Sequence, residues 1–132
     1  MFRLKVVTPH RMFFEAAVKT LVIRGIEGDL AIMKGTTPLL TPTKISVCTL
    51  HLEDGSKKEA ALGRGYIAVD QNGATLVVES AEWPEDIDLE RAHKAKERAE
   101  AYLQAKDKQI DYERAKIALA KAINRINAAN KK

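Results

Sequence analysis

Apolar and polar positions alternate through the first eighty or so residues of the chain, and then the pattern changes to a helical period. Alternation over four to eight residues, interrupted by glycine, proline or asparagine, is typical of short β-strands. Met33 falls within one of these runs and is expected in the core. The predicted strands are Leu4–Thr8, Phe13–Val18, Thr20–Ile23, the run between Gly28 and Gly35, Ile45–Leu52, Lys57–Leu62, Tyr66–Val69 and Thr75–Val78.

Two connections between these runs have the composition of hairpin turns. Glu53–Ser56 contains a glycine, and Asn72-Gly73 supplies the positive backbone angles that a tight turn requires. The segment Thr36–Pro42 contains two prolines, which exclude a helix and predict a loop. Leu39 and Leu40 should anchor this loop in the core or in a partner, and we favour the core.

About eight short strands, with no helical period between them, predict a small antiparallel β-sandwich in residues 1–84. The first domain is therefore expected to be all β.

Residues 85–132 predict a two-helix hairpin. Pro84 suits the start of a helical segment, and Asp86 or Asp88 can cap the amides exposed there. The first helix is expected from about Asp88 to Lys106, followed by a break at 107–109 and a second helix from Ile110. The predicted apolar faces are Ala92, Ala95, Ala99, Tyr102 and Leu103 on the first helix, and Ile110, Ala115, Leu119, Ala122, Ile123 and Ile126 on the second.

These faces are narrow and rich in alanine, and alanine contributes little apolar area. A hairpin held by such faces is expected to be marginally stable and able to open.

The net charge of +4 is concentrated in the helical part of the chain. Residues 1–86 carry 10 basic and 11 acidic side chains, whereas residues 87–132 carry 12 and 7. A basic helical segment indicates an anionic partner, such as a nucleotide, a nucleic acid, a lipid headgroup or an acidic protein surface.

The single cysteine, Cys48, excludes an internal disulfide and fits a reducing compartment. The chain starts with the alternation of a strand rather than with a signal peptide, and it contains no apolar run long enough for a membrane span.

Several cations are expected to converge on the hairpin. If its turn is centred near residue 107, Arg91 lies level with residue 123 and Arg98 with residue 116. Lys121 and Arg125 would then flank the level of Arg91, with Arg114 on the same face of the second helix. A polyphosphate would relieve the repulsion between these side chains. The alternative is that they are solvated helix faces, and geometry alone favours a capping role for Asp88.

The sequence gives little support for an enzyme. The three histidines are scattered, and no pair of side chains has the spacing of metal ligands. Cys48 lies within a predicted strand, where a packed thiol is more common than a nucleophile. No glycine-rich loop carries Lys-Ser or Lys-Thr, so a bound nucleotide would not be hydrolysed.

Three stretches resemble the epsilon subunit of bacterial rotary ATP synthases. They are Glu27–Pro42, Gly65–Val69 and the helical tail, and the resemblance extends over the whole chain. It implies an N-terminal β-sandwich that docks on the gamma subunit and the membrane c-ring. It also implies a C-terminal hairpin that folds on the sandwich or extends into the catalytic alpha/beta hexamer and inhibits ATP hydrolysis.

The same resemblance implies a peripheral subunit on the cytoplasmic face of the bacterial membrane. Such a subunit has no catalytic site of its own, reaches the membrane only through the complex and does not bind nucleic acid.

Some members of this family, mainly from bacilli, bind ATP on the folded hairpin. Their motif is Ile or Leu, Asp, two variable residues, Arg and Ala. The segment Ile87-Asp88-Leu89-Glu90-Arg91-Ala92 matches it. The resemblance also implies roles for Glu82 upstream and for Lys121 and Arg125 in the second helix, with Arg98 and Arg114 as further phosphate contacts. Lys121 departs from the usual arginine, which keeps the charge but loses the bidentate fork. Magnesium is expected on the phosphates, with no ligand that we assign to the protein.

The leading hypothesis is therefore a coupling and regulatory rotor subunit whose hairpin is held closed by ATP without hydrolysis. One alternative is a purely structural coupling subunit that binds no nucleotide. Another is a nucleic-acid-binding β-module with a basic tail, although the chain lacks aromatic side chains arranged for stacking on bases.

Overall fold

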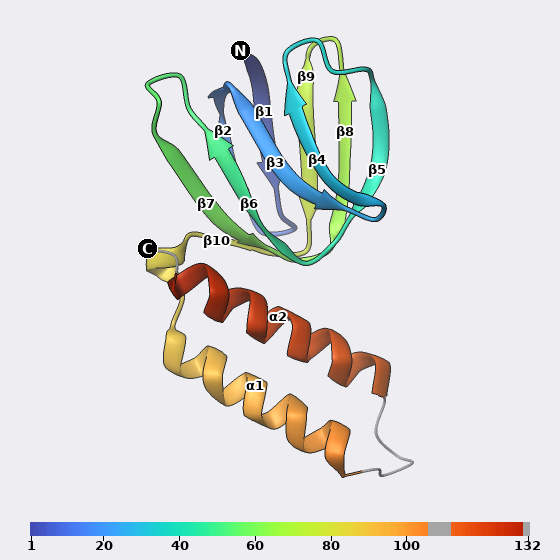
Figure 1. The fold of residues 1–132 in the computed structure, drawn as a ribbon, viewed down its shortest axis with the longest axis vertical. Coiled ribbons are helices and arrows are strands. Elements are labelled where there is room, and N and C mark those ends of the chain that lie inside the picture. The colour runs from blue at the N-terminus through green and yellow to red at the C-terminus, as the bar shows by residue number, and fades with distance from the viewer. Residues whose placement is uncertain (106–111, 131–132) are drawn as a thin grey trace. The chain divides into compact units, whose positions relative to one another are not determined.

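The computed structural model describes residues 1–105 and 112–130, which fall into two units, Met1–Glu82 and Trp83–Lys132. The first unit contains ten strands (Figure 1). They are β1 (Phe2–Val7), β2 (Met12–Val18), β3 (Thr20–Gly25), β4 (Gly28–Met33), β5 (Leu39–Thr43), β6 (Ser46–His51), β7 (Lys57–Leu62), β8 (Gly65–Asp70), β9 (Gly73–Val78) and β10 (Ala81–Glu82).

The strands follow one path, β10-β7-β6-β3-β5-β8-β9-β1-β2, with β4 added on the free side of β3. Strands β3 and β5 pair only at Gly25 and Thr43, so the path turns there and forms two layers. Figure 1 shows β1 and β2 behind β3 and β6. The predicted β-sandwich is confirmed.

Side chains that point between the layers form the core. Several strands bury alternate positions, such as Leu21 and Ile23 on β3 or Ile67 and Val69 on β8. Successive side chains of a strand point to opposite faces of the sheet, so a strand with one buried face buries every second residue. The largest fully buried side chains come from both layers; they are Leu4, Leu21, Ile23, Ile32, Leu50, Leu62, Ile67 and Leu76.

Both predicted hairpins are present. Strands β6 and β7 flank the turn that contains Gly55 (φ 88°), and β8 and β9 flank the turn that ends at Gly73 (φ 143°). In the second turn the Asp70 carboxylate accepts a hydrogen bond from the Asn72 N–H at 2.7 Å.

Pairing within the sandwich differs from the prediction at one place. Strands β1 and β9 run parallel, so the sandwich is not entirely antiparallel. Parallel neighbours need a long connection, and here the connection is made by all the strands between them. Such a pairing leaves no signal in the local sequence.

The predicted loop over residues 36–42 is also corrected, because its second half is strand β5, which pairs with β8. Pro42 is tolerated because β5 is an edge strand along most of its length. Leu40 is 72% exposed and Met33 is 52% exposed, so neither is in the core as predicted. Both occupy outward positions of their strands.

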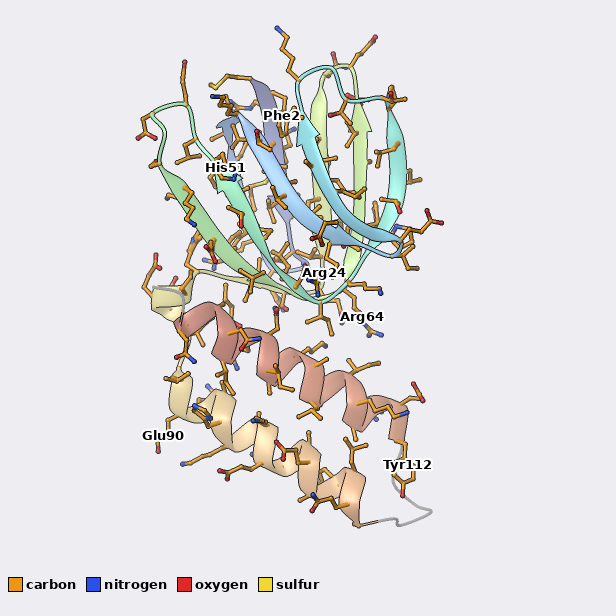
Figure 2. All side chains as sticks on the ribbon, viewed as in Figure 1. Phe2, Arg24, His51, Arg64, Glu90 and Tyr112 are labelled. Atoms are coloured by element: carbon orange, nitrogen blue, oxygen red, sulfur yellow. The ribbon has the colours of Figure 1, made fainter. Side chains whose placement is uncertain are left out.

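The second unit begins with a short 3-10 helix, η1 (Pro84–Asp86), with Pro84 at its first position as predicted. Helices α1 (Leu89–Gln104) and α2 (Tyr112–Asn130) follow. They lie side by side and run antiparallel in Figure 1, and α2 also contacts η1. Figure 2 shows Glu90 and Tyr112, each near the start of its helix, at opposite ends of the hairpin. The predicted break at 107–109, the end of the first helix at Lys106 and the start of the second at Ile110 lie outside the described residues.

Alanine dominates the buried positions of the hairpin. Ala92 and Ala99 are buried on α1, and Ala115, Ala122, Ile126 and Ala128 are buried on α2. Small side chains let helix axes approach closely. Tyr102 and Ile123, predicted on the apolar faces, are exposed, so the contact is narrower than predicted.

Candidate functional site

The predicted nucleotide motif lies at the start of α1, and most of it has a structural role there. Asp88 is the N-cap of α1, and its Oδ1 accepts a hydrogen bond from the Arg91 N–H at 3.1 Å. The capping role predicted for Asp88 is confirmed. The acceptor satisfies one of the amide groups that a helix start leaves without a partner.

Ile87 and Ala92 are buried and bracket this cap. They occupy the position before the N-cap and the fourth helical position, where a pair of apolar side chains often forms a hydrophobic staple. The Ile, Asp and Ala of the motif therefore define how the chain enters α1. Among the four fixed residues of the motif, only Arg91 has a side chain that takes no part in the cap and does not occupy a staple position.

The other predicted cations lie on both helices. Arg91 and Arg98 are exposed on α1, seven residues apart, while Lys121 and Arg125 are half-buried on α2, four residues apart. Lys121 and Arg125 each interact with another group of the chain, and the Nε atom of Arg125 is shielded from solvent. Arg114 is exposed in the first turns of α2 and also interacts with another group.

Other cations of the hairpin are neutralised along their own helix. Lys94 pairs with Glu90 at 3.4 Å, Lys96 with Glu100 at 3.7 Å, and Lys116 with Glu113 at 3.7 Å. In contrast, neither Arg91 nor Arg98 forms an ion pair within residues 1–105 and 112–130.

Glu82, the remaining predicted site residue, ends strand β10 and pairs with Ala61 of β7. It therefore belongs to the first unit, whereas the other predicted site residues belong to the second.

Counting along the described helices gives a second value for the level of Arg91 on α2. Arg91 lies 13 residues before Gln104, the last residue of α1, and Arg125 lies 13 residues after Tyr112, the first residue of α2. If these two helix ends are level, Arg91 faces the level of residue 125 rather than the predicted 123.

The described residues give no support to a catalytic cysteine or a metal site. Cys48 is buried, and desolvation raises its pKa to about 12, so the thiol is not a nucleophile near neutral pH. Among the described residues, no group of three or more His, Cys, Asp and Glu side chains could hold a metal ion. None of the described helices is long and apolar enough to cross a membrane.

Two family models together match nearly the whole chain. Residues 1–84 match the β-sandwich domain of the ATP synthase delta/epsilon chain, and residues 85–130 match its long α-helix domain.

Curated relatives agree with the family models over nearly the whole chain. The ATP synthase epsilon chain of Caldicellulosiruptor saccharolyticus is 43% identical over 95% of this chain and 90% of its own length. The epsilon chain of Syntrophomonas wolfei is 41% identical, with 98% and 95% covered.

Among solved structures, a chain of the Euglena gracilis mitochondrial ATP synthase has the same fold. Its TM-score is 0.84 at 21% identity, with 99% of this chain and 81% of that chain covered.

The chain therefore belongs to the ATP synthase delta/epsilon chain family, and its relatives are bacterial epsilon chains. It is a non-catalytic rotor subunit of a rotary ATP synthase with a coupling role, as the sequence predicted.

Proposed function

We propose that this rotor subunit regulates ATP hydrolysis through a hairpin that closes on ATP. The bound nucleotide would stabilise the folded hairpin, and its loss would favour opening. A ligand can shift this equilibrium only if it binds one state better than the other, and a site completed by both helices meets that requirement.

The observation that carries the proposal is where the cations lie relative to the buried positions. Each one directly precedes a buried residue: Arg91 precedes Ala92, Arg98 precedes Ala99, Lys121 precedes Ala122 and Arg125 precedes Ile126.

The approximate twofold symmetry of an antiparallel helix pair would place these four cations on one side of the hairpin. The spacing of seven residues from Ala92 to Ala99 is repeated from Ala115 to Ala122, as expected where one face of each helix is turned to the other. An antiparallel helix pair has an approximate twofold axis perpendicular to both helices. Equivalent positions, here those just before a residue of the contact, therefore lie on the same side of the pair. Arg91, Arg98, Lys121 and Arg125 would then line one side of the hairpin.

A polyphosphate suits this surface. Four cations on one side repel one another, and an anion of several charges removes that cost. Arginine binds phosphate oxygens bidentately, and lysine binds them as a point charge. Because Arg91 and Arg98 have no carboxylate partner in the described residues, phosphate would not have to displace one there.

Asp88 can add a contact to the base. Its Oδ1 is used by the cap, which leaves Oδ2 to accept a hydrogen bond from an amino group such as that of adenine. Magnesium would be held by the phosphate oxygens and water, since the described residues offer no cluster of ligands. Glu82, at the end of the first unit, is a further proposed contact.

We also propose the subunit's partners. The sandwich would dock on the gamma subunit and the c-ring, and the opened hairpin would reach the catalytic alpha/beta hexamer. The subunit would then be peripheral, on the cytoplasmic face of the membrane. The excess of basic over acidic side chains in residues 87–132 favours contact of the opened helices with an acidic surface.

Trp83, the only tryptophan, begins the second unit and provides a reporter. Titration of the full chain with ATP and magnesium should change its fluorescence in a saturable way, and calorimetry should give the same affinity. Arg91→Ala should weaken binding about tenfold or more, because it removes a charge-assisted contact to phosphate.

Lys96→Ala is the matched control, because this lysine lies on the same helix and is already paired with Glu100. It should change the affinity less than about twofold. No saturable heat with the unaltered chain would leave a structural coupling subunit without nucleotide binding. Equal losses in the two variants would contradict a specific phosphate contact at Arg91.

A further inference from the structure

One end of the sandwich contains a cavity of about 450 Å³. Its lining comes from both layers, with the end of β4 on one side and the adjoining ends of β1, β8 and β9 on the other. Figure 2 shows Phe2, one of the lining residues, at this end and Arg64 at the opposite end of the sandwich. Segments far apart in the sequence line the cavity, so the alternation of residues along single strands does not indicate it.

The inner wall of the cavity is apolar. Ile32 of β4 and Val69 of β8 are 1% and 7% exposed, and both belong to the core. Phe2, which is half-buried, and Pro38 add further apolar lining. A hydrocarbon group placed against this wall would be removed from water, which favours its binding.

The outer part of the lining carries one more positive than negative side chain. Its cations are Arg3 and Lys34, and its anion is Asp70, so the lining side chains have a net charge of +1. Arg3 is paired with Glu15 at 3.6 Å. Lys34 is exposed and forms no ion pair within residues 1–105 and 112–130. A ligand with a single negative group therefore suits this part of the cavity.

Two side-chain amides can assist in holding such a group. Gln71 and Asn72 are exposed and line the cavity, and their side chains make no hydrogen bond in the part of the chain that the structure describes. An amide NH₂ group donates hydrogen bonds, and a carboxylate accepts them. The polar lining therefore offers a cation and hydrogen-bond donors to the same kind of ligand.

Internal hydrogen bonds hold the two turns that border the cavity. After β4, the Met33 N–H donates to the Thr36 Oγ1 at 2.9 Å, and the Thr36 N–H donates to the Met33 carbonyl oxygen at 3.1 Å. Between β8 and β9, the Asp70 carboxylate accepts from the Asn72 N–H at 2.7 Å. These bonds fix both turns independently of a ligand, and sites for small molecules are for the most part preformed in this way.

We propose that this cavity binds a small amphipathic anion of the medium-chain carboxylate type. Its apolar body would lie against Ile32 and Val69, and its carboxylate would lie near Lys34. The cavity volume falls within the range of about 300–1,000 Å³ for small-molecule sites. With about 30 Å³ for each group the size of a water molecule, it holds up to roughly fifteen non-hydrogen atoms. A lipid with two long acyl chains exceeds that volume.

This site is separate from the proposed nucleotide site. All its lining residues belong to the first unit, and none of them is a proposed contact of ATP. The inference therefore does not depend on the proposed function. A ligand that binds only the folded sandwich would also stabilise it by mass action.

Octanoate is the probe for the first experiment. In an NMR titration of the full chain, the methyl signals of Ile32 and Val69 should shift in a saturable way. 1-Octanol has the same body without the charge and should bind about tenfold more weakly. Octylamine carries the opposite charge and should give no saturable shift at these methyl groups.

Two exposed lysines provide a matched pair of variants. Lys34→Gln should weaken the binding of octanoate about fivefold and change that of 1-octanol less than about twofold. The control is Lys44→Gln, because Lys44 is also exposed and forms no ion pair among the described residues. Lys44 follows Thr43, which pairs with Gly65, so it lies at the Arg64 end of the sandwich. This variant should change the affinity for octanoate less than about twofold.

A third variant fills the cavity itself. Val69→Phe adds volume at the inner wall and should weaken the binding of octanoate and 1-octanol alike, about tenfold or more. Circular dichroism and urea unfolding of each variant check the fold.

The contrary outcomes are distinct. No saturable shift at Ile32 and Val69, or shifts that persist in folded Val69→Phe, would overturn the site. Binding of 1-octanol as tight as that of octanoate, or equal losses in Lys34→Gln and Lys44→Gln, would overturn the preference for an anion.

Discussion

The Oδ1 atom of Asp88 accepts a hydrogen bond from the Arg91 N–H, with 3.1 Å between oxygen and nitrogen. This bond joins the two polar residues of the predicted nucleotide motif through the backbone of one and the side chain of the other. It fixes the first turn of α1 and, with it, the direction in which the Arg91 side chain leaves the helix. The cap and the proposed ligand contact are therefore made by the same residues.

Two substitutions of Asp88 separate the effect of its capping oxygen from the effect of its negative charge. Asp88→Ala removes the cap and should lower the stability of the helical unit by about 1 kcal/mol. Asp88→Asn keeps a capping oxygen but removes the charge. We expect hydrogen exchange in the first turn of α1 to accelerate in Asp88→Ala and to stay unchanged in Asp88→Asn. Equal acceleration in both variants would show that the carboxylate charge, rather than the cap, stabilises the turn.

Lys121 offers a gain-of-affinity test of the proposed site. Lys121→Arg restores the guanidinium that the ATP-binding motif usually carries and can add one hydrogen bond to phosphate. An extra hydrogen bond of about 1 kcal/mol corresponds to about fivefold tighter binding of ATP. Calorimetry with ATP and magnesium measures it, with Lys116→Arg as control because that lysine already pairs with Glu113. Tighter binding in both variants, or in neither, would contradict a phosphate contact at residue 121.

The parts of this structure that the sequence predicted are those set by local chemistry. Asp88 caps α1, Pro84 starts the 3-10 helix, and the turn at Asn72-Gly73 joins β8 to β9. Each depends on residues within one turn or one hairpin, where backbone preference and a nearby hydrogen bond decide the conformation.

The errors concern residues whose placement depends on distant parts of the chain. Leu40 and Met33 are apolar, yet the parity of their strands turns them outward. The parallel pairing of β1 with β9 joins the first strand of the sandwich to one of the last in the sequence, and the residue types near β1 do not indicate it.

The site shows the same division. The roles of Asp88, Ile87 and Ala92 are local and could be predicted, whereas the level of Arg91 relative to α2 depends on where each helix ends. If Gln104 and Tyr112 are level, the predicted partner level, residue 123, differs from the counted level, residue 125, by about half a helical turn.

Gly65 is expected to be among the least replaceable residues of the sandwich. A Cβ atom on Gly65 would overlap the Val77 carbonyl oxygen on the neighbouring strand β9, and neither backbone can move without breaking the pairing. Gly65→Ala should lower the free energy of unfolding by about 3 kcal/mol or more. Gly55→Ala, where the added Cβ meets only open space and the cost is the positive φ of 88°, should cost about 1 kcal/mol. Urea unfolding of the full chain compares the two, and equal losses would contradict the close approach at Gly65.

Cys48 should make the sandwich less stable in alkali. Burial raises the pKa of its thiol from 9.0 to about 12, so the folded state holds a proton that the unfolded chain loses above pH 9. Stability from this group is therefore complete below pH 9 and falls as the pH rises toward 12, by about 1.4 kcal/mol at pH 10. Cys48→Ala removes this dependence, while lysine and tyrosine titrate alike in both proteins. Urea unfolding at pH 8 and pH 10 should show a loss of unfolding free energy that is larger in the unaltered chain by about that amount.

The Cys48 thiol of the folded protein should react with a thiol reagent at pH 8 only as fast as the sandwich opens. Rapid reaction of the folded protein, or the same loss of stability in Cys48→Ala, would contradict the raised pKa.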